Sequence, residues 1–112
     1  MDCEVPLKSM ITPSVQKLKL GSSLVINCSI IGDPIDDIKW LKNGQTITFN
    51  GSNRLKLIGK DRIAIDFIQA EDSGIYQCLV SNEEESSQSA TLIKIICEYN
   101  SFHSQNSIKI NY

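Results

Sequence analysis

Apolar and polar residues alternate in short runs along most of the chain, as expected of strands that bury one face. Turn-forming residues such as Gly32-Asp33-Pro34 and Asn43-Gly44 separate these runs. Their spacing of about 8–12 residues is typical of a β-sandwich or barrel, and Asn-Gly between two runs indicates a hairpin. The pattern predicts strands at 7–12 and 15–20 (one strand broken at Pro13), 23–31, 37–42, 46–49, 54–58, 62–67, 74–81 and 89–96.

The period of two assigns one face of each strand to the core. Cys28 and Cys78 fall on the apolar faces of their strands, so they can meet across a sandwich with Trp40 beside them. The residues assigned to the inward faces are Leu24, Ile26, Cys28, Ile30, Ile38, Trp40, Ile63, Ile65, Phe67, Tyr76, Cys78 and Val80.

Composition supports an all-β chain and excludes several function classes. The 112 residues include 17 Ile, 4 Val and 4 Thr against only 3 Ala, and β-branched side chains favour pleated sheets over helices. A chain of this length forms a single domain at most. The net charge of −2 leaves no basic excess to neutralise phosphates, so nucleic acid is not expected as the partner.

The four cysteines, Cys3, Cys28, Cys78 and Cys97, allow three full pairings, and composition does not choose among them. They form no Cys/His metal pattern, and His103, the single histidine, has no cysteine near it. We therefore expect no metal and no cofactor. The chain also lacks a nucleophile elbow and a Gly-rich phosphate loop, so we expect no enzyme and no small-molecule substrate.

The two ends of the chain depart from the strand pattern. Residues 1–5 are a flank without the apolar segment of a signal peptide, and no run of about 18 apolar residues spans a membrane. Residues 97–112 are polar, and we expect a disordered extension there, although an edge strand over 107–111 is an alternative. The expected domain therefore covers residues 6–96, as one part of a longer protein.

The most specific signal is the run Ile63-x-Ile65-x-x-Ile68-x-x-x-Asp72-x-Gly74-x-Tyr76-x-Cys78. Ile65 and Ile68 are expected in the core, and Gly74 at a tight turn. Tyr76, two residues before the cysteine, can bond back to the loop backbone as a tyrosine corner. The loop carboxylate of Asp72 suits a bidentate pair with an arginine.

These residues, with the Cys28…Trp40…Cys78 spacing, resemble the I-set domains of the immunoglobulin superfamily. The resemblance covers about residues 6–96. It implies an all-β immunoglobulin-like sandwich of two antiparallel sheets with Greek-key connections, and a disulfide between Cys28 and Cys78. Of the two candidate partners of Asp72, Arg54 and Arg62, the family pattern favours Arg54.

Finer features are similar to an amino-terminal immunoglobulin domain of Dscam-type adhesion molecules. They include Trp40-Leu41-Lys42-Asn43-Gly44 and the run from Glu71 to Cys78. This resemblance implies an extracellular, cell-surface module of homophilic adhesion and axon guidance, which binds protein and reaches the membrane only through a longer chain. Two alternatives stay open: an intracellular structural I-set domain of the muscle-filament kind, and a secreted immune-type immunoglobulin protein.

Two kinds of surface feature are candidates for function. Leu41, Ile75 and Leu79 point outward on two neighbouring strands, so they are a candidate protein-contact face, although scattered surface hydrophobes are also normal. Asn50 and Asn27 each begin an N-x-Ser sequon and are candidate glycosylation sites. Asn50 is the better acceptor because it falls in a predicted loop.

Two further features depart from a simple reading. Cys3 and Cys97 lie at opposite ends of the expected sandwich, roughly 30 Å apart by strand rise, so we expect no disulfide between them. The acidic run Glu83-Glu84-Glu85 falls in a predicted loop. Such loops carry recognition in many binding proteins, but a solvated turn is the simpler interpretation.

Overall fold

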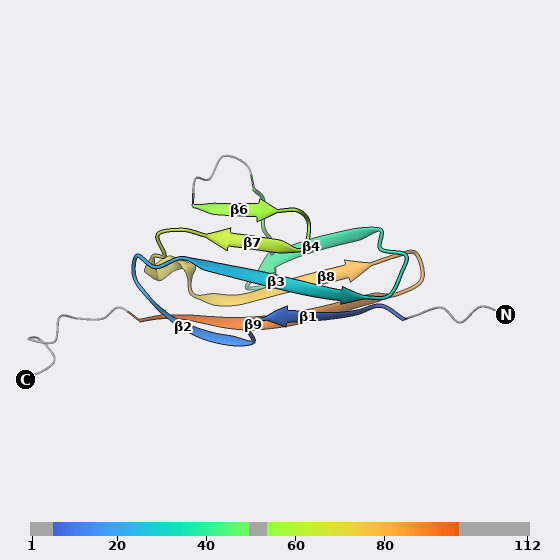
Figure 1. The fold of residues 1–112 in the computed structure, drawn as a ribbon, viewed down its shortest axis with the longest axis horizontal. Coiled ribbons are helices and arrows are strands. Elements are labelled where there is room, and N and C mark those ends of the chain that lie inside the picture. Colours follow the sequence, from blue (N-terminus) through green and yellow to red (C-terminus); the bar gives the residue numbers. More distant parts are fainter. Residues whose placement is uncertain (1–5, 50–53, 97–112) are drawn as a thin grey trace, which may run out of the picture.

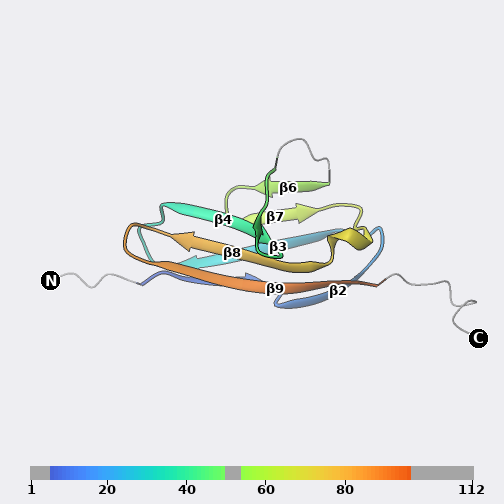
Figure 2. The ribbon, with the colours of Figure 1, turned by 180° about the vertical axis from the view of Figure 1, so that it is seen from behind.

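The computed structural model describes residues 6–49 and 54–96, which form two packed sheets of mostly antiparallel strands. The four-stranded sheet has the order β1-β3-β7-β6 and faces the viewer in Figure 1. The five-stranded sheet has the order β2-β9-β8-β4-β5 and faces the viewer in Figure 2. The strands are β1 (Lys8–Thr12), β2 (Val15–Lys19), β3 (Leu24–Ile31), β4 (Asp37–Lys42), β5 (Gln45–Thr46), β6 (Leu55–Ile58), β7 (Arg62–Ile65), β8 (Gly74–Ser81) and β9 (Ser86–Ile96).

The predicted all-β immunoglobulin-like sandwich is confirmed. The core between the sheets is built from the inward residues of both, and Ile26, Ile63 and Val80 have no exposed surface. A single 3₁₀ turn, η1 (Ala70–Asp72), joins the two sheets between β7 and β8. The structure therefore realises the period-two pattern as two half-buried sheets.

The break at Pro13 moves the chain from one sheet to the other. β1 pairs antiparallel with β3, whereas β2 pairs parallel with β9, placing Val15 beside Leu92. Pro13 and Ser14 provide the crossing, since proline has no backbone N–H to give to a ladder. What the sequence pattern treats as one broken strand is thus a strand shared between two sheets.

Phe67 corrects the predicted core. β7 ends at Ile65, and Phe67 has a φ of 52° and is 70% exposed. The left-handed backbone at Phe67 shifts the inward-outward alternation by one residue. Ile68 is therefore buried in place of Phe67. Backbone hydrogen bonds from Gly21 N–H to Ile68 and from Ile68 N–H to Ser22, both 2.8 Å, hold this turn.

Two further strands differ from the prediction by more than one residue. The short edge strand is Gln45–Thr46 rather than 46–49, because the two-residue turn at Asn43 and Gly44 starts pairing at once. Ile47 and Phe49 instead pack against the core outside any strand. β9 begins at Ser86, three residues early, because Ser86 already pairs with Ser81.

Candidate functional site

A disulfide between Cys28 and Cys78 joins the two sheets at their centres. Its Cα atoms are 6.3 Å apart, and both residues are buried. Trp40 on β4 lies directly opposite Cys78 on β8. The indole N–H of Trp40 donates to the Lys60 carbonyl at 3.1 Å. The ring is therefore both packed and hydrogen-bonded, as a buried tryptophan requires.

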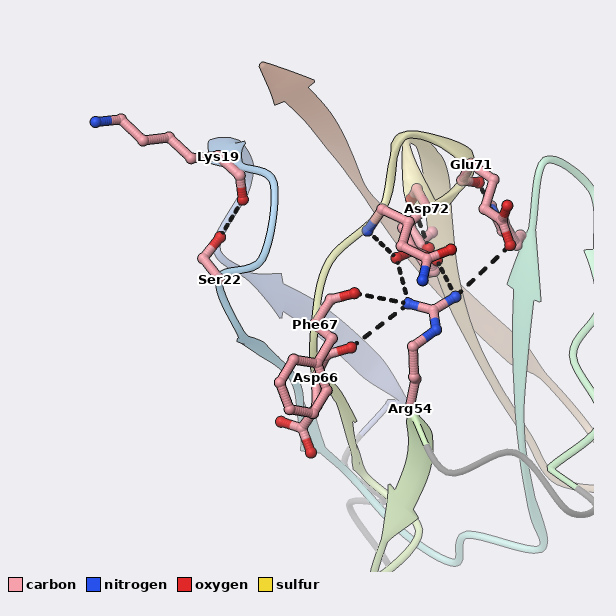
Figure 3. A network of polar contacts seen from close by, with 10 residues as sticks. Lys19, Ser22, Arg54, Asp66, Phe67, Glu71 and Asp72 are labelled. Atoms are coloured by element: carbon pink, nitrogen blue, oxygen red, sulfur yellow. Dashed lines mark hydrogen bonds and ion pairs between the residues drawn. The ribbon is translucent and has the colours of Figure 1, made fainter. Parts of the chain in front are cut away.

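A polar network closes one end of the sandwich, and Figure 3 shows it around Arg54. The guanidinium of Arg54 donates to both carboxylate oxygens of Asp72, at 2.7 and 3.2 Å. It also donates to the backbone carbonyls of Asp66 and Phe67. Of the two candidate partners of Asp72, the structure therefore selects Arg54. The other candidate, Arg62, lies on β7 between Asn27 and Ile58. Such a bidentate pair fixes geometry as well as charge.

The same turn carries the tyrosine corner. The Tyr76 hydroxyl donates to the Asp72 carbonyl at 2.7 Å, and the Gln69 N–H donates to the Asp72 carboxylate at 2.7 Å. Gly74 has a φ of 146°, where a Cβ would lie 2.7 Å from the Asn43 side-chain oxygen. Because of that approach, Asn43 accepts from the Ile75 N–H at 2.9 Å and ties the β4–β5 turn to β8.

Burial and hydrogen bonding shift the pKa of Asp72 in opposite directions. Desolvation alone would raise the pKa of Asp72, but the hydrogen bonds from Arg54 and from the Gln69 N–H outweigh it and lower that pKa below its ordinary value. The hydrogen bond to Asp72 likewise raises the pKa of Arg54. Burial raises the pKa of Tyr76. The carboxylate of Asp72 accepts from protein donors, so this network stabilises the fold.

The three residues of the candidate contact face lie on the outer side of the five-stranded sheet. Ile75 is 46% exposed, and Leu41 and Leu79 are half-buried. The structure adds two residues that the sequence reading missed: Leu92 pairs with Ile75, and Val15 pairs with Leu92. No local pattern places β2 beside β9, so this row of apolar side chains appears only in three dimensions.

The opposite face carries one of the two sequons. Asn27 is half-buried on β3, between Thr12 of β1 and Arg62 of β7, so it lies on the outer side of the four-stranded sheet. Its neighbourhood includes Met10, which is 65% exposed. Asn50, Cys3, Cys97 and the extension at 97–112 lie outside the described residues.

The acidic run belongs to one pole of the molecule. Asn82 accepts from the N–H groups of Glu84 and Glu85, and its amide donates to the Pro34 carbonyl at 2.9 Å. The β3–β4 and β8–β9 loops therefore lie side by side around a hollow of about 310 Å³. In the two stretches that the structure covers, no three His, Cys, Asp or Glu side chains group as metal ligands do.

The part of the chain that the structure describes contains no helix long and apolar enough to cross a membrane.

Comparison with known proteins places this geometry in a family. The model of the immunoglobulin I-set domain matches residues 8–95. The cell adhesion molecule Dscam1 of Drosophila melanogaster is 30% identical over 90 residues, which are 80% of this chain and 4% of that protein. The cell adhesion molecule DSCAM of Gallus gallus is 31% identical over 83 residues, 74% of this chain and 4% of that protein. The chain thus spans a small fraction of the length of these relatives.

Solved structures agree with the sequence relatives. The crystal structure of the N-terminal four Ig domains of Dscam1 isoform 4.44 matches with a TM-score of 0.70 and 29% identity, covering 83% of this chain and 21% of that one. A structure described as the basis for Dscam isoform specificity matches with a TM-score of 0.68 and 31% identity, covering 81% and 21%. The sandwich, its central disulfide and these matches lead to one conclusion: the chain belongs to the immunoglobulin I-set family and is similar to the amino-terminal domains of Dscam cell adhesion molecules.

Proposed function

We propose that this chain is an adhesion and recognition module of a cell-surface ectodomain, which binds another copy of the same protein through immunoglobulin domains. The observation that carries the proposal is the match of four-fifths of the chain to the N-terminal domains of Dscam1, in sequence and in fold together. Residues 6–96 are the folding unit in this proposal, and the module binds rather than catalyses.

The disulfide supports an extracellular location. Disulfides form and persist in oxidising compartments and are rare in the cytosol, and the Cys28–Cys78 bridge lies at the centre of the core. An intracellular filament-type I-set domain would keep the same two thiols reduced. Non-reducing peptide mapping of the chain, expressed in its native secretory host, separates these cases: a Cys28–Cys78 peptide supports the proposal, and two free thiols contradict it.

Bead clustering tests homophilic binding directly. Fluorescent beads coated with the disulfide-bonded chain are expected to cluster with one another, because many weak contacts acting together raise avidity. Beads of a second colour, coated with an unrelated I-set domain, are the control and should stay outside the clusters. Beads of this chain that remain dispersed at high coating density would overturn the homophilic proposal.

A further inference from the structure

The outer side of the five-stranded sheet carries a continuous apolar strip across four strands. Val15 on β2 pairs with Leu92 on β9, which pairs with Ile75 on β8. Leu41 on β4 pairs with Gln77, so its diagonal neighbours on β8 are Ile75 and Leu79, within reach of long side chains. We call these five residues, Val15, Leu41, Ile75, Leu79 and Leu92, the apolar strip.

Charge is distributed unevenly about this strip. At one end the two neighbouring loops and the start of β4 carry Asp33, Asp36, Asp37, Glu83, Glu84 and Glu85. At the other end Lys17 pairs with Lys94, on the outer side of β2 and β9. Lys94 follows Ser86 by eight positions along β9, or about 27 Å at the usual strand rise. Lys39, opposite Leu79 on β4, pairs with Asp37 at 4.0 Å, so carboxylates still outnumber the cation at the first end. The face therefore has a predominantly acidic end, an apolar middle and a basic end.

We propose that this face binds the same face of a second copy, with the strands of the two copies running in opposite directions. A two-fold axis in the interface and perpendicular to the strands brings the acidic end of each copy onto the basic end of the other. An axis at the level of Gln77 also sets Leu79 of one copy against Ile75 of its partner, because these residues flank Gln77 on β8. The parallel arrangement would oppose like charges at both ends.

The size of the face fits weak, multivalent adhesion. Four strands about 4.8 Å apart, with their side chains, give a surface of roughly 20 by 27 Å. A pair would bury about 1,100 Å² in total, near the lower limit for specific interfaces. One domain alone would pair weakly, and beads or cells that present many copies would hold together.

The opposite face supplies a matched control. Met10 on β1 is 65% exposed, more than Ile75 at 46%, and lies on the outer side of the four-stranded sheet. A sequon asparagine, Asn27, occupies the middle of that sheet. If apolar exposure alone caused association, a charge at Met10 would weaken it at least as much as a charge at Ile75.

The inference rests on the proposed homophilic function, and one bead assay separates the two. Ile75→Lys is expected to reduce clustering about tenfold or more, the effect of losing a central apolar contact, while Met10→Lys leaves it within about twofold. Val15→Lys, on the edge strand β2, repeats the test should Ile75→Lys unfold, which circular dichroism detects. Dispersed wild-type beads overturn both proposals. Wild-type clustering that survives Ile75→Lys and Val15→Lys overturns only the face.

A charge swap tests the orientation. In the antiparallel pair Glu84→Lys and Lys94→Glu each weaken clustering of beads that carry one variant, because like charges then meet. Mixed beads carrying one variant each cluster again, since both ends become complementary. In a parallel pair each single variant would cluster as the wild type does, and that result overturns the antiparallel arrangement.

Discussion

At the scale of single residues, Asp72 determines how the closed end of the sandwich is held. One carboxylate accepts from Arg54 and from the Gln69 N–H, while the backbone carbonyl of Asp72 accepts from Tyr76. The side chain of Asp72 is 10% exposed and that of Arg54 is 27% exposed. The Arg54–Asp72 pair is thus intermediate between a surface ion pair and a fully buried one. Its contribution to the free energy of unfolding should be intermediate as well.

Replacing Arg54 with Met should lower the free energy of unfolding by about 2 kcal/mol, between the values for exposed and for broken buried pairs. The substitution removes both guanidinium N–H groups that donate to the largely buried carboxylate of Asp72. Lys56→Met is the control, because the Lys56–Asp66 pair is exposed and 3.9 Å apart, and should cost less than about 1 kcal/mol. Urea unfolding measures both, and equal losses would contradict a special role of Arg54.

The lowered pKa of Asp72 gives the molecule a predictable acid sensitivity. A carboxylate with a lower pKa in the folded than in the unfolded state stabilises the fold above the unfolded pKa, about 3.9. That stability is lost as the pH falls below this value and through the folded pKa. Asp72→Asn should therefore be less stable than wild type at pH 7, and the difference should shrink as the pH falls below about 4. Thermal unfolding of both proteins as a function of pH measures this difference. A difference that stays constant as the pH falls would refute the linkage.

At the scale of elements, the connections decide which strand joins which sheet. β1 continues into β2 through Pro13, and this short crossing takes the chain from the four-stranded to the five-stranded sheet. Gly32, after β3, has a φ of 111°, and a Cβ there would lie 2.5 Å from the Pro6 carbonyl oxygen. The backbone before β1 therefore passes directly over the end of β3, where only glycine leaves room.

Alanine substitutions at two glycines with positive φ distinguish the cost of backbone strain from the cost of the close approach at Gly32. Gly32→Ala should destabilise by about 3 kcal/mol or more, since the strain of a positive φ is combined with a clash against backbone. Gly21→Ala is the matched control: its φ is 85°, but no atom lies within 4 Å of the added Cβ, so only about 1 kcal/mol is expected. Chemical denaturation of both variants checks this, and equal losses would contradict the close approach as the cause.

At the scale of the whole molecule, the Cys28–Cys78 disulfide and a continuous hydrophobic core join the two sheets within the described residues. The Cys28–Cys78 bridge closes 50 residues of sequence separation and links the centre of one sheet to the centre of the other. The two outer faces then differ in character. One carries a sequon asparagine amid exposed Met10 and Ile31, and the other carries the apolar strip between ends of opposite charge.

Removal of the bridge should reduce stability by about 4 kcal/mol in the chain-entropy model for a loop of this length. The measurement is the unfolding free energy of the double variant Cys28→Ala, Cys78→Ala, against the oxidised wild type. The reduced wild type is the matched control, because it lacks the bond but keeps the sulfur atoms in the core. A double variant as stable as the oxidised protein would show that the core alone holds the sheets.

Much of the fold follows from local chemistry. The alternation in β3, β4 and β8 placed their inward residues correctly, because a one-residue slip would put every apolar side chain into water. The prediction that Phe67 faces the core was wrong. The alternating pattern continues through Phe67, and nothing in it indicates that a positive φ at this residue follows the end of β7. The ion pair needed the resemblance as well, because Arg54 and Arg62 are equal candidates by residue type alone.

The sequence by itself determined that this protein is a half-buried β-sandwich with a cysteine on each of two inward faces, because strand parity is a local property. Only the tertiary structure decided that β2 lies beside β9 and that Val15 and Leu92 extend the apolar strip. It also decided that the acidic loops gather at one end of this strip, opposite Lys17 and Lys94. Pairing between distant strands depends on how the whole chain closes its core, and no local pattern records it.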